Sequence, residues 1–384
     1  MPFDFDTPID RRHPTSIKWS AYPDDVIPLW VADMDFHSPP AVMAALKARA
    51  DHGVFGYQAD APTLRDLLAE RYRLRHQIQV TPEEIVFVPG VVNALNLVCR
   101  AFEQPGDGVL VITPIYPPFL SAPKNGGKTL QTAEMAVVQD GQRLRYEIDF
   151  DRLEAAVTPQ TKLFLLCNPH NPVGRAYTRV ELEKLAEFAL RHGLLIISDE
   201  IHCDLLHPEG RHISMAGLSP EVSARTVTLS APSKTFNIPG LACAFAVIED
   251  PALLKAFRET AFSIGAFVNT LGYTAAEAAY RDGQAWLDDL LAYLTGNRDL
   301  VVEYVEKYLP QIKLTVPEAT YLAWLDCRDL HLPETPYKYF LERAKIAFSP
   351  GETFGQGGAG FVRLNYGCTR ATLIEALDRM VESL

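Results

Sequence analysis

The middle of the chain alternates short apolar runs with amphipathic segments. Two segments repeat apolar residues at helical spacing, Val91–Phe102 and Arg179–His192. Six apolar runs have the length and residue types of buried strands. They are Glu84–Val88, Val109–Ile112, Leu163–Cys167, Leu194–Ser198, Thr226–Leu229 and Cys243–Ile248. Apolar strands that alternate with helices predict an α/β fold, with a mostly parallel sheet covered by helices on both faces.

The last hundred residues follow a different pattern. A helical segment near Trp286–Tyr308 leads to alternating strands at Tyr321–Asp326 and Phe361–Asn365. We therefore expect a large domain over residues 46–284 and a smaller α+β domain that combines residues 285–384 with residues 1–45. A length of 384 residues agrees with two domains.

Composition narrows the class of protein. Hydrophobic residues make up 48% and charged residues 22% of the chain, as in soluble globular proteins. The net charge of −12, without a basic cluster, argues against a nucleic-acid partner. No apolar run is long enough to span a membrane, and the acidic N-terminus does not resemble a signal peptide. The six scattered cysteines are expected to be free thiols in the cytoplasm.

Polar residues follow four of the expected strands. Asn171, Asp199 and Lys234 each come at or soon after a strand end, and Gly90 stands between a strand and a helix. In an open α/β sheet, ligands bind outside the carboxyl ends of the strands. The four segments are therefore expected to meet at one site.

The residue types at this site suit pyridoxal-5′-phosphate (PLP). Lys234, in a partly desolvated pocket, can lose its proton and form a Schiff base with an aldehyde. Asp199 can pair with a protonated pyridine nitrogen, which makes the ring an electron sink. The helix that begins at Gly90, Val91 and Val92 offers free N–H groups to a phosphate.

Two further residues complete this hypothesis. The ring of Tyr116 can stack on the pyridine, and the guanidinium of Arg363 can bind a substrate carboxylate through two hydrogen bonds. Each residue also has an ordinary alternative. Lys234 could be solvated, Asp199 could cap a helix, and Asn171 could belong to a turn; Tyr116 could pack in the core, and Arg363 could form a surface ion pair.

Longer segments carry a family resemblance. They are Trp30–Phe36, Phe55–Tyr57, Cys167–Gly174, Ser198–His202 and Ser233–Leu241. With them the chain resembles fold-type I PLP enzymes of the aspartate aminotransferase superfamily, and among these the cystathionine β-lyase-like C–S lyases of the MalY/PatB group. The motifs are highly specific for PLP and moderately specific for the reaction.

The resemblance implies further roles in binding the cofactor. Asn171 should bond its phenolic oxygen, and Ser233 and Ser230 should hold its phosphate. Tyr57 should reach the phosphate of a neighbouring subunit, which implies a homodimer with shared sites. His202 stands where many aminotransferases have a tyrosine, which favours the lyase branch.

The resemblance also suggests how the substrate is held. Trp30 and Ala32, in the first segment, are expected to contact the substrate together with Asn171 and Arg363. Trp30, Phe36, Tyr116 and Phe354 are expected to shape the pocket. Many relatives have a phosphate-binding arginine shortly after the lysine, and no arginine follows Lys234 closely here.

The predicted activity is β-elimination from an L-cysteine conjugate such as cystathionine, which yields a thiol, pyruvate and ammonia. Lys234, Asp199 and Tyr116 are the predicted catalytic residues. An aminotransferase is the main alternative, and a PLP-binding regulatory protein with little turnover is another. No metal site is expected, because His202, Cys203 and His207 lack a second pair of ligands.

Two other patterns are rejected as sites. The glycine-rich segment from Gly355 to Gly360 precedes a strand and not a helix, so it is interpreted as a turn and not as a dinucleotide site. His202 and Cys203 are taken as neighbours on a strand, whose side chains point to opposite faces and would not meet.

Overall fold

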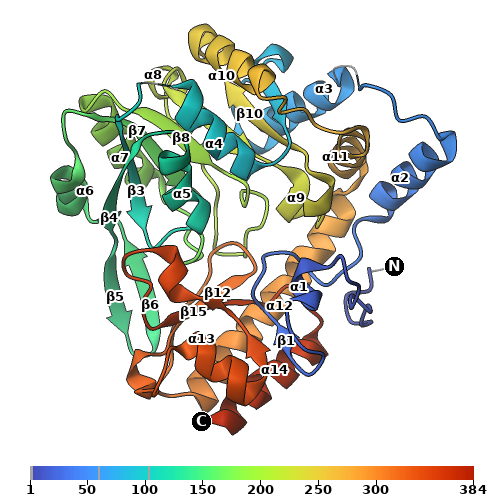
Figure 1. Cartoon of the computed structure of the whole chain (residues 1–384), viewed down its shortest axis with the longest axis vertical. Helices are drawn as coiled ribbons and strands as arrows, with labels where there is room; N and C mark the ends of the chain where they lie inside the picture. Colours follow the sequence, from blue (N-terminus) through green and yellow to red (C-terminus); the bar gives the residue numbers. More distant parts are fainter. Residues whose placement is uncertain (1–2, 59–60, 103) are drawn as a thin grey trace.

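A seven-stranded sheet forms the centre of the larger part of the molecule (Figure 1). The computed structural model describes residues 3–58, 61–102 and 104–384. Residues 1–2, 59–60 and 103, which belong to the two expected domains, lie outside the described residues. The strand order is β2-β10-β9-β8-β7-β3-β4. β10 runs antiparallel to both of its neighbours, and the other pairs are parallel. The strands are β2 (Ile85–Val88), β3 (Gly108–Thr113), β4 (Thr129–Glu134), β7 (Thr161–Cys167), β8 (Leu195–Asp199), β9 (Thr226–Ser230) and β10 (Ala244–Ile248).

Helices cover both faces of this sheet because its central strands are apolar on both sides. In β3, Val109 and Val111 belong to one buried cluster, and Leu110 and Ile112 belong to another. The first cluster includes residues of α4 (Val91–Ala101), α5 (Pro117–Asn125) and α10 (Pro251–Ser263). On the other face lie α6 (Phe150–Ala156), α7 (Arg179–Arg191) and α8 (Pro220–Ser223). α3 (Pro62–Arg71) and α11 (Thr270–Asp282) form a further cluster with β2 and β10. The expected α/β fold is confirmed, as are the six strands and two helices within one or two residues of their expected ends.

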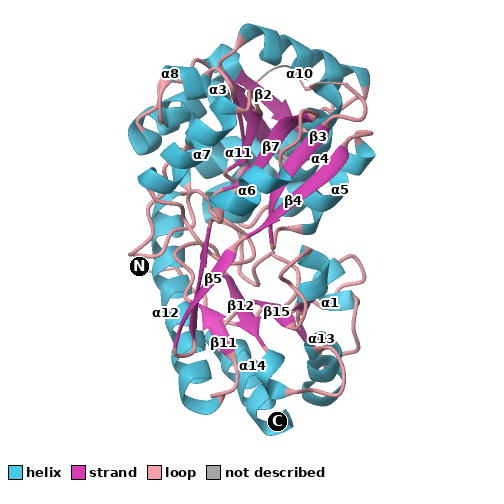
Figure 2. Ribbon diagram, turned by 90° about the vertical axis from the view of Figure 1, so that its left-hand side faces the viewer, coloured by secondary structure: helices cyan, strands magenta, loops and turns pink. Residues whose placement is uncertain are grey.

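A second sheet lies below the first, and Figure 2 shows the two bodies one above the other. Its strand order is β14-β15-β12-β11-β6-β5. The strands are β5 (Ala136–Asp140), β6 (Arg143–Glu147), β11 (Lys313–Thr315), β12 (Leu322–Asp326), β14 (Ser349–Pro350) and β15 (Phe361–Asn365). Apolar residues of β11, β12 and β15 share one core with those of α12 (Gln284–Tyr308), α13 (Pro336–Tyr339) and α14 (Arg370–Ser383), whereas those of β6 join the cluster that contains α6, α7 and α8. The helix and the two strands expected here are present.

The expected domain limits stay a prediction, and three elements do not follow them. β5 and β6 fall within residues 46–284 but belong to the second sheet. α2 (Pro40–His52) includes residue 45 and packs against α11. Since β4 is followed after one residue by β5, the chain passes directly from the first sheet to the second.

The N-terminal segment joins the second body. A short ladder pairs β1 (Ile27–Pro28) in parallel with β13 (Ile346–Ala347), and α1 (Ile17–Ser20) precedes it. Short turns of helix complete the structure, namely α9 (Pro232–Thr235) and those at Tyr72–His76, Pro82–Glu84, Met215–Gly217, Pro239–Leu241, Arg328–Leu330, Phe340–Ala344 and Gly351–Phe354. No described helix is both long and apolar enough to span a membrane.

One local expectation is wrong. His202 and Cys203 lie in a turn and not on a strand, because β8 ends at Asp199 and the N–H of Cys203 donates to the carbonyl of Glu200. The segment from Gly355 to Gly360 is a turn before β15, as expected. Three of its glycines have φ between 82° and 86°, a region that other residues rarely adopt.

Candidate active site

A cavity of about 190 Å³ opens at the carboxyl ends of β7, β8 and β9. Most of the predicted site residues line it. They are Ala32, Gly90, Val91, Val92, Tyr116, Asn171, Asp199, His202, Ser233 and Lys234. Because these residues come from separate segments on several strand ends, the fold brings the predicted site together as the parallel topology requires.

Lys234 supplies the amine of the cavity and is part-buried. It lies in the single helical turn of α9, directly after β9, and its Nζ donates to the carbonyl of Ala32 at 2.6 Å. Burial and the nearby guanidinium of Arg363 lower the pKa of Lys234 to about 8, against the opposing charges of Asp33 and Asp199. About a tenth of the amine is therefore unprotonated at pH 7, which suits a nucleophile or a base.

Asp199 is the buried acid at the end of β8. One carboxylate oxygen accepts from the N–H of Ile201 at 3.1 Å. Burial raises the pKa of Asp199 to about 7, although that hydrogen bond and Lys234 both work to lower it. A cationic N–H group in the cavity would favour the charged carboxylate. A protonated pyridine nitrogen is such a group.

The start of α4 forms an anion cradle beside these two residues. Gly90 caps the helix with φ at 117°, and α4 begins at Val91, so the first N–H groups of an 11-residue helix point out of its N-terminus at the cavity rim. Ser233 lines the same cavity. Ser230 does not line it, and its hydroxyl donates to the carbonyl of Glu200 at 3.4 Å. Of the two serines predicted to hold the phosphate, only Ser233 lines the cavity.

Tyr116 and Asn171 are held together at the cavity wall. The N–H of Tyr116 donates to the carbonyl of Asn171 at 3.2 Å, and Tyr116 caps α5. Burial raises the pKa of the Tyr116 phenol, so it stays protonated near neutral pH. Both side chains line the cavity, Tyr116 with an aromatic ring and Asn171 with an amide.

Arg363 reaches this site from the second sheet. It stands on β15, and its Nη1 donates to Oδ1 of Asn171 at 2.9 Å. Its Nη2 donates to the carbonyl of Trp30 at 3.0 Å and to the hydroxyl of Ser349 at 3.1 Å. Burial lowers the pKa of Arg363 to about 10.

The surroundings of Arg363 suit an anionic ligand. Among the described residues no carboxylate pairs with this guanidinium, and its Nε has no partner. Its guanidinium lies 4.9 Å from the centre of the Phe354 ring. A buried cation held by neutral groups alone is ready for a carboxylate.

His202 lines the cavity as a neutral imidazole. Burial and the nearby charges of Lys234 and Arg363 lower its pKa to about 3. Its Nδ1 is buried and has no hydrogen-bond partner among the described residues. An unpaired buried polar atom in a cavity wall indicates a missing ligand group.

Three residues expected at the substrate do not line this cavity, and their contact with a substrate stays a prediction. The indole of Trp30 donates to the carbonyl of Lys18 at 3.2 Å and does not line the cavity, although its backbone carbonyl holds Arg363. Phe36 packs in the core against Phe5, with ring centres 5.1 Å apart. Phe354 lies behind Arg363 and not on the cavity wall.

Tyr57 is fully exposed in the single chain, with a relative accessibility of 110%. It does not line the cavity. Its predicted role needs a second subunit and therefore stays a prediction.

The cavity also contains residues that were not predicted. Cys167 and Cys243, which were interpreted only as buried thiols, line it, as do Asn93, Ile201, Pro239 and Ala242. Cys167 and Cys243 each stand at one end of an expected strand, and this position was the signal in the sequence that could have placed them at the site. No group of His, Cys, Asp and Glu side chains that could hold a metal occurs in residues 3–58, 61–102 and 104–384.

Comparison with known proteins agrees with this geometry. The family model for "Aminotransferase class I and II" matches residues 24–380. Cystathionine β-lyase PatB of Bacillus subtilis is 40% identical over 99% of each chain. The crystal structure of OvoB matches with a TM-score of 0.94 at 43% identity, covering 100% of this chain and 99% of that one. The PLP-bound C–S lyase of Staphylococcus hominis matches with a TM-score of 0.92 at 30% identity, covering 100% and 98%.

The fold and the cavity together define a PLP-dependent enzyme of the aminotransferase fold. The chain belongs to the aminotransferase class I and II family, and its relatives include the cystathionine β-lyases. The residues present fit the cofactor on grounds of chemistry. A part-buried amine, a buried acid, an anion cradle and an unpaired imidazole nitrogen surround one cavity.

A first prediction concerns Asp199 in the cofactor-free protein. Its pKa of about 7 in the folded chain lies above the ordinary value of 3.8, so the folded chain loses stability as pH rises through this interval. Asp199→Asn stays neutral and removes that cost. The variant should be more stable than the wild type at pH 8, on the order of 1–3 kcal/mol, with little difference near pH 4. Urea unfolding at both pH values measures this.

Asp204→Asn provides the matched control for this experiment. Burial works against ionisation there too, but Arg71 and His76 lower the pKa of Asp204, so that variant should lose stability at pH 8. Added PLP should stabilise the wild type more than Asp199→Asn. A loss of stability at pH 8 in cofactor-free Asp199→Asn would contradict the assigned environment.

Proposed function

We propose that this enzyme cleaves the Cβ–S bond of an L-cysteine conjugate such as L-cystathionine, releasing a thiol, pyruvate and ammonia. The observation that carries the proposal is the part-buried amine of Lys234, with a pKa of about 8, in one cavity with Asp199 and close to Arg363. The 40% identity to a protein named cystathionine β-lyase PatB supports the choice of reaction.

The cofactor would be held by residues from both ends of the cavity. Lys234 would bind the aldehyde, Asp199 the ring nitrogen, and the N-terminus of α4 with Ser233 the phosphate. Tyr116 would stack on the ring, and Asn171 with His202 would bond the phenolic oxygen. When bound, PLP withdraws the electron pair that deprotonation leaves at the substrate Cα.

The protein's own groups would then orient the substrate and move its protons. Arg363, already braced by Asn171 and Ser349, would bind the α-carboxylate and thereby fix the Cα–H bond. The unprotonated amine of Lys234 would take the α-proton. The Cβ–S bond then breaks, its electron pair leaves with the thiolate, and hydrolysis of the remaining three-carbon unit gives pyruvate and ammonia.

Aminotransfer is the main alternative, because it shares every step up to loss of the α-proton. The cavity lining offers one observation against a dicarboxylic substrate. Among the described residues, Lys234 is the cavity's only Lys or Arg side chain, and Arg363 stands just behind Asn171. No described guanidinium therefore lines the cavity itself to bind a distal carboxylate, and Arg363 reaches it only through Asn171. A PLP-binding regulatory protein would have the same cofactor site but little turnover.

Assembly and location complete the proposal. We propose a homodimer in which Tyr57, exposed in the single chain, reaches the phosphate of the partner subunit. Cytoplasmic location is supported by six cysteines that are all buried and free.

The cofactor assignment predicts a yellow protein whose visible band depends on Lys234. Lys234→Ala removes the only lysine amine among the described residues of the cavity lining, so the band should be lost, while Lys255→Ala, at an exposed lysine, should keep it. Absorption spectra and peptide mapping after borohydride reduction measure this. Attachment of the cofactor to another lysine would refute the assignment.

The reaction assignment predicts steady release of thiol and pyruvate from L-cystathionine without an added keto acid. The physical reason is that a thiolate leaves readily once the Cα proton is lost. Transfer of the amino group to 2-oxoglutarate should be at least about tenfold slower, because no guanidinium among the described residues lines the cavity to bind its distal carboxylate. Coupled assays of pyruvate, thiol and glutamate distinguish the three functions. Rapid transfer without pyruvate would establish the aminotransferase, and bound PLP without either product the regulatory protein.

The dimer assignment predicts that Tyr57→Phe weakens PLP binding by about tenfold, the worth of one hydrogen bond to a charged group. Tyr308→Phe, at another exposed tyrosine, should have no effect. Mixing Tyr57→Phe chains with Lys234→Ala chains should create one intact site per hybrid dimer and restore activity at limiting PLP. A fully active monomer in sedimentation experiments would contradict this arrangement.

A further inference from the structure

The carbonyl that holds Lys234 belongs to a segment without regular secondary structure. Ala32 accepts two hydrogen bonds, from Nζ of Lys234 at 2.6 Å and from the hydroxyl of Tyr321 at 2.8 Å. The surrounding residues 31–35 form bends and no helix or strand. Besides the hydrogen bond from the N–H of Asp35 to the carbonyl of Gly367, side chains from elsewhere in the chain hold these residues.

Two asparagines fix the backbone of this segment. Nδ2 of Asn365 donates to the carbonyls of Val31 at 2.6 Å and Asp33 at 2.7 Å. Asn237 accepts from the N–H of Met34 at 2.9 Å and donates to its carbonyl at 2.9 Å. These bonds hold the backbone on both sides of Ala32.

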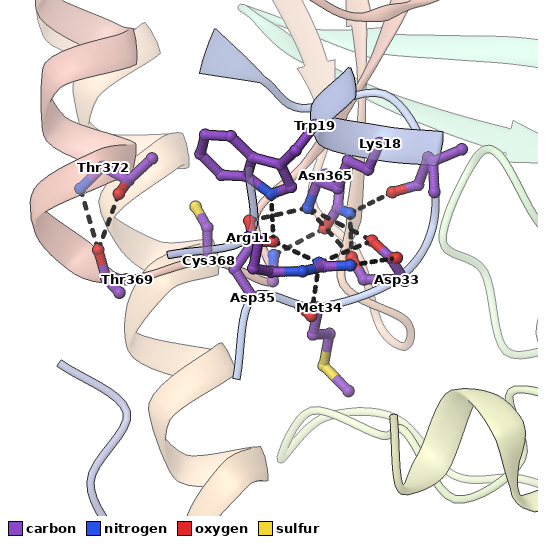
Figure 3. A network of polar contacts seen from close by, with 12 residues as sticks. Arg11, Lys18, Trp19, Asp33, Met34, Asp35, Asn365, Cys368, Thr369 and Thr372 are labelled. Atoms are coloured by element: carbon purple, nitrogen blue, oxygen red, sulfur yellow. Dashed lines mark hydrogen bonds and ion pairs between the residues drawn. The ribbon is translucent and has the colours of Figure 1, made fainter. Parts of the chain in front are cut away.

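Four charged side chains form a second layer of contacts around the same segment (Figure 3). Arg11 pairs with Asp33 at 2.9 Å and with Asp35 at 2.5 Å. Lys18 pairs with Asp35 at 2.9 Å, lies 3.7 Å from Asp33, and donates to the carbonyl of Asp33 at 3.2 Å. The indole of Trp19 donates to Asp35 at 2.9 Å. We call Arg11, Lys18, Asp33 and Asp35 the N-terminal ion network.

Burial makes this network more than a surface ion pair. The side chain of Lys18 is 0% exposed and that of Asp35 is 7% exposed, whereas Asp33 and Arg11 retain 18% and 22%. Two cations and two anions balance. Removing one member leaves the others partly uncompensated at low exposure, so their charges act over a distance on nearby groups.

Asp33 is the member of the network that acts on Lys234. Its carboxylate raises the pKa of the Lys234 amine, against burial and Arg363, which lower it. Asp199 on β8 acts in the same direction as Asp33. His202, in the turn that follows, is neutral, and Tyr321 shares the Ala32 carbonyl. Among the described residues, Asp33, next to Ala32 in the chain, and Asp199 are thus the two carboxylates that raise the pKa of this amine.

We propose that the N-terminal ion network is a positioning device for Lys234, in which Asp33 is the residue that couples the network to the amine. The network holds the Ala32 carbonyl against Nζ, and the Asp33 carboxylate sets how readily the amine gives up its proton. Arg11 moderates this effect, because it is the cation paired directly with Asp33. The proposal rests on the role of Lys234 in the proposed function.

The test measures protonation of Lys234 without any turnover. The full-length, cofactor-free chain is labelled with trace acetic anhydride over a range of pH, and the Lys234 peptide is quantified by mass spectrometry against the exposed Lys124. Asp33→Asn removes an anion, so the midpoint of labelling should move to lower pH, with about threefold faster labelling at pH 7. Arg11→Gln removes the cation that balances Asp33, so the midpoint should move to higher pH.

Two further variants separate charge from structural damage. Asp24→Asn makes the same chemical change at an Asp whose side chain is 94% exposed, and it should leave the midpoint unchanged. Asp33→Glu keeps the charge and should stay near the wild-type midpoint. Loosening of the segment alone would move the Asp33→Asn and Arg11→Gln midpoints in the same direction, which would overturn the proposal.

Each outcome bears on the proposal. If Asp33→Asn fails to fold, Arg11→Gln decides alone, and an unchanged or lowered midpoint in the folded Arg11→Gln chain would overturn it. If the protein had no lyase activity, the labelling midpoints of the cofactor-free chain would still be valid. The labelling result and the reaction assignment can therefore fail separately.

Discussion

Burial of ionisable groups around one cavity is the constraint on which the site depends. Burial favours the neutral form of Lys234, Asp199 and Arg363. It lowers the pKa of Lys234 to about 8 and that of Arg363 to about 10, and it raises the pKa of Asp199 to about 7. Each group has weak compensation within the protein. As direct hydrogen-bond partners, the amine has a carbonyl, the acid has one N–H group, and the guanidinium has neutral acceptors. Each therefore needs a charged or reactive partner that the ligands supply.

The two sheets divide this task between them. The first sheet supplies the amine and the acid from the ends of β9 and β8, and the second supplies Arg363 from β15. Contacts across the boundary join the two sets. Arg363 donates to Asn171, and the N–H of Ile115 donates to the carbonyl of Phe354 at 2.9 Å. The distance between the substrate's carboxylate site and the amine is thus set by how the two sheets meet.

The first sheet was predictable because its signal is local. Apolar runs such as Leu163–Cys167 are buried along most of their length, and the rule on strand ends then places Asn171, Asp199 and Lys234 at one edge. β5 gave no such signal, because four of its five residues are exposed. β6 alternates buried and exposed residues, but its parallel partner β11 lies about 170 residues farther along the chain, beyond what a local pattern can identify.

The site was predictable where a residue's role follows from its position on a strand, and less so where it depends on side-chain direction. Ser230 and Ser233 are equally plausible phosphate ligands in sequence, yet Ser230 ends β9 with its hydroxyl on Glu200. Trp30 contributes a backbone carbonyl and not its indole. The N-terminal ion network carries no local signal, because Lys18 has the sequence context of a surface lysine and its buried partner Asp35 lies 17 positions farther along the chain.

The identity of the residue at position 202 matters because of the charges already present. A protonated imidazole would add a third cation beside Lys234 and Arg363, and burial with these two cations keeps the pKa of His202 near 3. The ring is therefore neutral throughout the range in which Lys234 titrates. Its unpaired Nδ1 can bond a ligand oxygen without changing the net charge of the cavity. A tyrosine there would offer an acidic O–H group instead, whose ionisation would couple to the amine. With His202, the protonation of Lys234 is left to the two carboxylates and the guanidinium that surround it.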